Sequence, residues 1–176
     1  MPPFRFSPIK NQAELAEAIK YTHLKCFELC KNTFGRYLPV AGNIGIFCHE
    51  AAEYEFLTKL REELTDANDN WNKKYYRLHQ PISVSPQGEV PGAVYSYLYI
   101  RQPDETKPQV GDLDFVLDKA EYNELKNSLL ADKQIKDLKV LDRPDLDLLE
   151  LADPEVDALA FIGTKDMTEN IKAGNK

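Results

Sequence analysis

The sequence predicts an α+β domain in which a strand, a helix and further strands occur twice in the same order. Residues 43–48 are typical of a short apolar strand. Residues 50–66 keep apolar positions at helical spacing, and the expected buried stripe of this helix is Phe56, Leu57, Leu60 and Leu64. Residues 111–117 and 118–130 show the same succession later in the chain. The aligned positions are Gly42 with Gly111, Ile44 with Leu113, and Ile46 with Phe115. We therefore expect two related halves that share one mostly antiparallel sheet.

The other segments complete these halves or flank them. Residues 1–42 predict an extended, proline-rich arm followed by an amphipathic helix over residues 11–32, with Asn11 as its cap. A single α+β domain is expected over residues 43–163. Its first half, 43–104, ends with strands near 75–85 and 94–101, and its second half, 111–163, ends with short strands at 138–141, 146–151 and 158–162. Residues 164–176 are expected to form a polar, partly helical tail.

Composition narrows the classes of function. The chain has 176 residues and a net charge of -7, with no basic cluster, which argues against nucleic acid and anionic membranes as partners. The opening residues lack the apolar stretch of a signal peptide, and no run is long enough to span a membrane. Three cysteines are an odd count without a secretory signal, so a disulfide framework is not expected. The sequence indicates an acidic cytoplasmic protein.

Strand alternation separates the presumed sheet into two faces. One face is aliphatic and suits helix packing, with Leu98, Leu113 and Phe115 among its members. The other face combines aromatic rings, arginines and carboxylates, which suits a ligand with a flat apolar body and an anionic group. The alternative is a solvated face on which tyrosines and ion pairs only stabilise the sheet. The candidate ligand-binding residues are Asn43, Arg77, His79, Tyr95, Tyr97, Tyr99, Arg101, Asp112 and Asp114.

Asp112 and Asp114 also support an enzymatic alternative. Their spacing on a strand places both carboxylates on one face, the arrangement that nucleotidyltransferases use to hold magnesium. No Gly-Ser element precedes them at a suitable distance, and Asp145 and Asp147 repeat the same spacing elsewhere. For these two reasons, a magnesium-dependent enzyme ranks as the second hypothesis, after ligand binding.

Two histidine-containing clusters have residue types that can bind a metal. His23, Cys26 and Cys30 share one helical face, but that face is otherwise apolar and cysteine packs as a small apolar residue, so core packing is favoured. His49 and Glu50, followed by Glu53, superficially resemble a helical zinc-protease motif, but the second histidine of that motif is absent. Neither cluster predicts a catalytic or metal site, and no cofactor is expected.

The order of strands and helices is similar to that of the vicinal oxygen chelate superfamily, which contains glyoxalases and bleomycin-resistance proteins. Residues 148–161 look like the final hairpin of that superfamily, and residues 97–104 look like its counterpart in the first half. Metal-using members supply a histidine from an opening strand and a glutamate from a closing strand. The corresponding positions here hold Asn43 and Asp112, with Ala160 and a position near Gln109 at the closing strands. The resemblance therefore implies the non-metal branch, whose members bind small molecules and often dimerise.

The leading hypothesis is non-catalytic binding of a small anionic or aromatic ligand by the Tyr/Arg-rich face. The expected partner is a small molecule or a protein, and a homodimer is compatible with the resemblance. The alternatives are a metal-dependent enzyme that uses Asp112 and Asp114, either nucleotidyltransferase-like or a divergent chelate-fold enzyme, and a protein-interaction or regulatory module.

Overall fold

The computed structural model describes residues 4–68, 73–141 and 147–173, which form four helices and a seven-stranded sheet. The expected arm, tail and sixth strand therefore extend in part outside the described residues. The elements in chain order are α1 (Gln12–Phe34), β1 (Val40–Phe47), α2 (Ala51–Leu64), β2 (Tyr76–Val84), β3 (Ala93–Arg101), β4 (Gly111–Val116), α3 (Lys119–Leu130), β5 (Leu138–Val140), β6 (Leu149–Leu151), β7 (Leu159–Gly163) and α4 (Lys165–Ala173).

The sheet has the strand order β2-β3-β1-β4-β7-β6-β5. The strands that open the two halves, β1 and β4, lie side by side at its centre and are antiparallel. Each is also paired in parallel with the last strand of its own half, β1 with β3 and β4 with β7. The α+β class is confirmed, but the expectation of a mostly antiparallel sheet is wrong because the sheet is mixed. A helical crossover in each half allows the parallel pairing.

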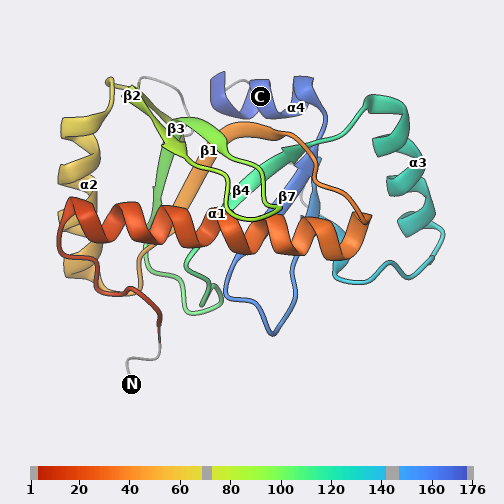
Figure 1. Ribbon diagram of the computed structural model, residues 1–176, viewed down its shortest axis with the longest axis horizontal. Coiled ribbons are helices and arrows are strands. Elements are labelled where there is room, and N and C mark those ends of the chain that lie inside the picture. Colours follow the sequence, from red (N-terminus) through yellow and green to blue (C-terminus); the bar gives the residue numbers. More distant parts are fainter. Residues whose placement is uncertain (1–3, 69–72, 142–146, 174–176) are drawn as a thin grey trace.

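The long helix α1 covers one side of the central strands (Figure 1). It begins at Asn11, as predicted, because the Asn11 side chain accepts a hydrogen bond from the backbone N–H of Glu14 at 2.9 Å. It ends at Gly35, which adopts a φ of 70° and donates its N–H to the Lys31 carbonyl. The ring of Phe27 packs edge-on against Phe115 of β4, with centroids 5.1 Å apart. We call this side of the sheet the α1 face.

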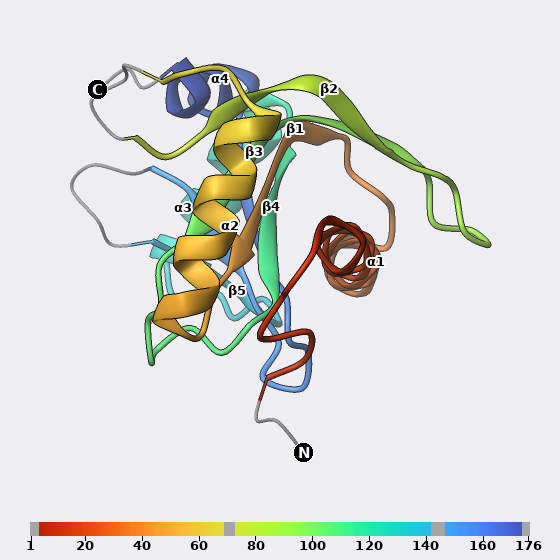
Figure 2. The same ribbon diagram turned by 90° about the vertical axis from the view of Figure 1, so that its left-hand side faces the viewer.

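The other helices lie at the ends and on the opposite side of the sheet. Helix α2 contacts β2 and β3 at one end, and α3 contacts β5 at the other (Figure 1). The segment expected as a polar tail forms α4, which contacts β1 and β4 from the side opposite α1 (Figure 2). No helix in the described residues has the length and apolar character needed to cross a membrane.

The buried stripe of α2 differs from the predicted one at one position. Phe56 was expected to be buried, but 37% of its surface is exposed, whereas Leu57 is fully buried. The inward line of α2 runs through Glu53 and Leu57, which are one helical turn apart. The helix therefore turns a carboxylate inward where the sequence suggested an aromatic ring.

Glu53 ties the N-terminal arm to the domain. Its carboxylate is 2% exposed and accepts hydrogen bonds from the backbone N–H groups of Ile9 and His49, at 2.9 and 2.8 Å. It also accepts a hydrogen bond from the Ser7 hydroxyl at 2.6 Å. The residue that the sequence associated with a protease-like motif thus serves as the acceptor for three donors. The neighbouring His49 ring stacks on Phe4, with centroids 3.9 Å apart.

Replacing Glu53 with alanine is expected to lower the free energy of unfolding by about 3 kcal/mol, because buried donors lose their acceptor. Urea denaturation measures this change. The control is Glu55→Ala, an exposed position on the same helix. Equal effects of the two substitutions would contradict a stabilising role for the hydrogen bonds that Glu53 accepts.

Candidate functional site

Three polar side chains meet on the side of the sheet opposite α1. Asn43 comes from β1, and Asp112 and Asp114 come from alternate positions of β4. Their exposed fractions are 1%, 2% and 2%. The Asn43 Nδ2 donates to Asp114 Oδ2 at 2.9 Å. We call these three residues the polar floor.

The polar floor follows from strand alternation. Leu113 and Phe115 point toward α1, so the two aspartates between and beside them point away from it. Asn43 pairs with Tyr97 in the parallel ladder between β1 and β3, which places that ring on the same side. The interpretation of this face as a solvated surface is wrong for the floor, because all three of its residues are buried.

Gly45 makes room for one of the carboxylates. A Cβ atom at this position would lie 2.2 Å from Asp112 Oδ1 and 3.3 Å from Tyr99 Cδ1. The absence of a side chain lets the Asp112 carboxylate lie directly over β1. No motif in the sequence indicated this role for Gly45.

Replacing Gly45 with alanine is expected to lower the free energy of unfolding by about 2 kcal/mol through steric overlap. Most of this cost should vanish in an Asp112→Ala background, where the overlapping oxygen is absent. A double-mutant cycle based on urea denaturation measures this coupling, which we expect to exceed about 1 kcal/mol. Additive effects of the two substitutions would show that the close approach is not the cause.

The two carboxylates are held in an environment that disfavours their charge. Burial, and next the neighbouring Asp114, raise the pKa of Asp112 to about 7. The cationic side chains of Lys74, Arg101 and Lys107 oppose this rise. Burial also raises the pKa of Asp114 from its ordinary value. Asp112 therefore changes protonation near neutral pH, which is unusual for an aspartate.

Tyrosine rings surround the polar floor. Tyr75 is 3% exposed, and its ring centroid lies 5.7 Å from that of the half-buried Tyr99. The Lys74 Nζ lies 5.3 Å from the Tyr75 centroid and 5.2 Å from the Tyr99 centroid. Burial, followed by the charges of the two aspartates, raises the pKa of Tyr75 well above its ordinary value. The neutral Tyr75 hydroxyl therefore persists across the physiological pH range.

A lysine from α4 also reaches this region. Lys172 is 9% exposed, and its Nζ donates to the Ala41 carbonyl at 2.9 Å. The same ammonium lies 5.4 Å from the Tyr97 centroid and pairs with Glu169 at 3.0 Å. Sequence reasoning missed Lys172 because its segment looked like a polar tail, and no local signal indicates which strand a terminal helix will contact.

One atom of the floor lacks a partner. The Asn43 Oδ1 is buried and has no hydrogen-bond partner among the described residues. Buried amide oxygens are nearly always satisfied by protein or water, so this oxygen indicates a missing donor. The floor therefore offers two carboxyl groups and one acceptor that is unpaired among the described residues.

The structure brings together five of the nine residues that the sequence predicted. Tyr97 and Tyr99 of β3 pair in the ladder with Asn43 and Gly45, and Gly45 pairs in turn with Asp112 on β4. The five residues are Asn43, Tyr97, Tyr99, Asp112 and Asp114.

Tyr95 was predicted to share the face of Tyr97, but it lies under α1. It is fully buried, and its hydroxyl hydrogen-bonds His23 Nδ1 at 2.7 Å. The pairing of β2 with β3 is irregular here, because residues 78–81 lie opposite Ser96 alone. A bulge of this kind increases the local twist and changes the direction of the following side chains.

The three cationic candidates are exposed or already paired. Arg77 and His79 are exposed, and His79 Nε2 lies 3.1 Å from Asp66 Oδ1. Arg101 Nη2 pairs with Asp104 Oδ2 at 3.0 Å. The edge position of β2 explains the exposure of Arg77 and His79, because that strand has a neighbour on one side only.

The His23 cluster belongs to the core. His23 also hydrogen-bonds the Pro91 carbonyl at 3.0 Å through Nε2, and Cys26 Sγ donates to the Leu159 carbonyl at 3.3 Å. Cys26 and Cys30 are both fully buried among apolar side chains, as the core-packing interpretation predicted. Within residues 4–68, 73–141 and 147–173, no group of three or more His, Cys, Asp or Glu side chains is arranged to hold a metal ion.

No protein-family model, curated protein or solved structure matches the chain. The resemblance to the vicinal oxygen chelate superfamily therefore stays a prediction.

Proposed function

We propose that the protein binds a small ligand, without catalysis, over the polar floor. The observation that carries this proposal is the buried floor itself, in which Asp112 and Asp114 lie side by side and Asn43 Oδ1 has no hydrogen-bond partner from the residues that the structure describes. Burying unsatisfied polar groups costs free energy, and apolar side chains at these positions would avoid that cost. A ligand that supplies the missing hydrogen bonds gives the arrangement a function.

The surrounding rings favour a ligand with a flat apolar part. Tyr75 and Tyr99 form a tilted pair beside the floor, and Tyr97 lies along the same strand as Tyr99. Aromatic side chains with a few convergent polar groups are typical of small-molecule sites. The half-buried Tyr97 and Tyr99 offer ring surface that a ligand can contact.

Of the two ligand features expected from the sequence, the anionic group has less support than the flat aromatic part. Arg77 lies opposite Tyr97 in the ladder between β2 and β3 but is exposed, as is His79. Arg101 already pairs with Asp104. The floor repels an anion whenever Asp112 or Asp114 is ionised. The acceptors of the floor instead favour a ligand that donates hydrogen bonds.

Three compounds with the same phenol ring test this function: 4-ethylphenol, 4-hydroxyphenylacetate and tyramine. We expect saturable binding of at least one of them to the wild-type protein by isothermal titration calorimetry. Binding should weaken at least about tenfold in the Asn43→Ala variant, because that variant loses an acceptor of the floor. The control is Asn127→Ala, an exposed position on α3. Absence of binding by all three compounds, or equal binding to both variants, would overturn the proposal.

The same oxygen atoms favour one alternative, a metal-dependent enzyme. Carboxylates and an amide oxygen are the ligands that Mg²⁺ and Mn²⁺ prefer, and Asp112, Asp114 and Asn43 present such atoms together. Titration of chelator-treated protein with Mn²⁺, followed by electron paramagnetic resonance, distinguishes the two functions. Stoichiometric Mn²⁺ binding that Asp112→Asn abolishes would favour the enzyme.

A further inference from the structure

The position of the Lys172 ammonium defines a place for a cation beside the polar floor. Its Nζ lies 2.9 Å from the Ala41 carbonyl oxygen and 5.4 Å from the centroid of the Tyr97 ring. A carbonyl oxygen and the face of an aromatic ring are two groups that stabilise an ammonium. Lys172 is only 9% exposed, so most of its side chain is packed inside this region.

The carboxylates of the floor add to the attraction for a cation. Burial raises the pKa of Asp114, and the opposing influences are the hydrogen bond from Asn43 and the charges of Lys74 and Lys172. The charge of Lys172 therefore favours the ionised form of Asp114. The carboxylate, the carbonyl and the ring come from three different strands, β4, β1 and β3.

One acceptor atom of the floor has no donor in the described part of the chain. The Asn43 Nδ2 is engaged with Asp114, whereas the buried Asn43 Oδ1 has no partner within the described residues. An ammonium carries three N–H donors, which suits a site with several separate acceptors. Lys172 Nζ makes no hydrogen bond to Asn43 Oδ1 in its present position, so a ligand would need a second donor beside its ammonium to reach that oxygen.

We propose that the ligand carries a primary ammonium group, which takes the place of the Lys172 ammonium beside the Ala41 carbonyl and the Tyr97 ring. This inference rests on the proposed function and names the chemical class of its ligand. Lys172 of α4 then occupies the site in the free protein, and the ligand must displace this side chain to bind. The net charge of -7 favours the approach of such a cation over that of an anion.

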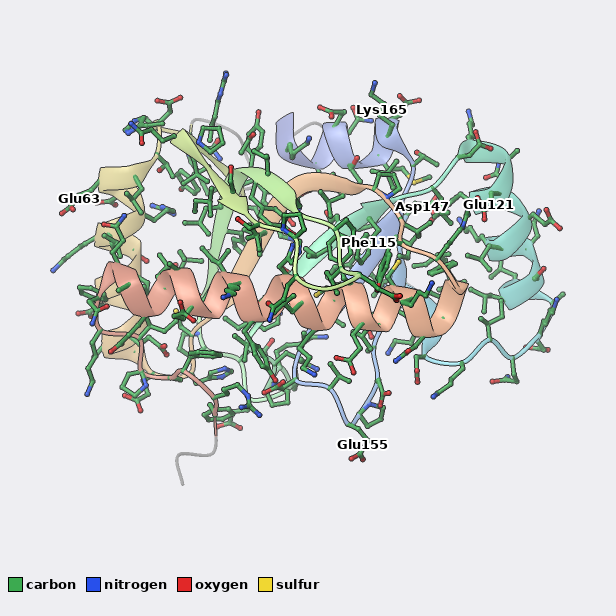
Figure 3. All side chains as sticks on the ribbon, viewed as in Figure 1. Glu63, Phe115, Glu121, Asp147, Glu155 and Lys165 are labelled. Carbon is green, nitrogen blue, oxygen red and sulfur yellow. The ribbon has the colours of Figure 1, made fainter. Side chains whose placement is uncertain are left out.

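Chemical rescue tests the ammonium position without knowledge of the ligand. Lys172→Ala removes a propylammonium-sized part of the side chain, and propylammonium chloride is then added during thermal denaturation. We expect a saturable rise in the unfolding midpoint, about threefold larger than that of Lys165→Ala, because bound ligand stabilises the folded state by mass action. Lys165 is a matched control, since it lies on the same helix and is exposed (Figure 3). An equal rise in the two variants, or an equal rise with 1-propanol, would overturn the inference.

The wild-type protein provides a second measurement, which does not depend on the folding of Lys172→Ala. Tyramine, 4-ethylphenol and 4-hydroxyphenylacetate share a ring and carry a cationic, a neutral and an anionic substituent. We expect tyramine to bind most tightly, and Lys172→Met to tighten its binding about tenfold by removing the competing ammonium. Tightest binding of 4-hydroxyphenylacetate would refute the ammonium and leave the proposed function standing. Failure of all three compounds to bind would refute both.

Discussion

Replacing Gly111 with alanine is expected to lower the free energy of unfolding by about 3 kcal/mol, because the added Cβ has no space. It would lie 2.2 Å from the Gly45 carbonyl oxygen, 2.9 Å from Thr22 Oγ1 and 3.2 Å from Ile46 Cδ1. The nearest of these atoms is backbone in the central pairing of β1 with β4, so a side-chain rotation cannot relieve the overlap. Either β1 separates from β4 or α1 moves away from the sheet.

Urea denaturation of Gly111→Ala and Gly35→Ala separates steric overlap from backbone conformation. Gly35 has a φ of 70° at the end of α1, and a Cβ there would meet no atom within 4 Å. Its substitution is expected to cost about 1 kcal/mol through the left-handed conformation alone. A cost at Gly111 no greater than the cost at Gly35 would contradict the tight crossing of α1 over the sheet.

The stability of the protein is expected to fall as the pH rises from about 4 to about 7, because of Asp112. The folded state holds a proton on this carboxyl up to a pKa of about 7, whereas the unfolded chain releases it near 4. The folded state therefore binds more protons within this window, and raising the pH favours unfolding. Full ionisation costs on the order of 4 kcal/mol if Asp112 titrates alone.

The Asp112→Asn variant isolates this contribution. It keeps the size of the side chain and removes its titration, so we expect it to be more stable than the wild type at pH 7.5 and to differ little at pH 4. The same carboxyl is influenced by four other side chains that remain in both proteins, Asp114, Lys74, Arg101 and Lys107. The difference between the two unfolding free energies, measured in urea across this range, is therefore the relevant quantity. A difference that does not change with pH would contradict a buried, protonated Asp112.

Much of the local structure could be predicted from the sequence because it depends on short-range contacts. The Asn11 cap, the apolar face of α1 and the alternation of β4 all follow from periodicity and from hydrogen bonds within a few residues. Alternation alone places Asp112 and Asp114 together on one face, opposite Leu113 and Phe115. These predictions are confirmed, apart from small shifts at the ends of the elements.

The candidate site depends on contacts between segments that are far apart in the sequence. The sequence alone could not predict these contacts. The irregular pairing of β2 with β3 turned Tyr95 toward α1, and the edge position of β2 left Arg77 and His79 exposed. The burial of the polar floor and the arrival of Lys172 from α4 were decided by packing across the sheet. Side-chain periodicity determines which residues share a face, but only the tertiary structure determines what covers that face and therefore whether its charges meet water, a lysine or a ligand.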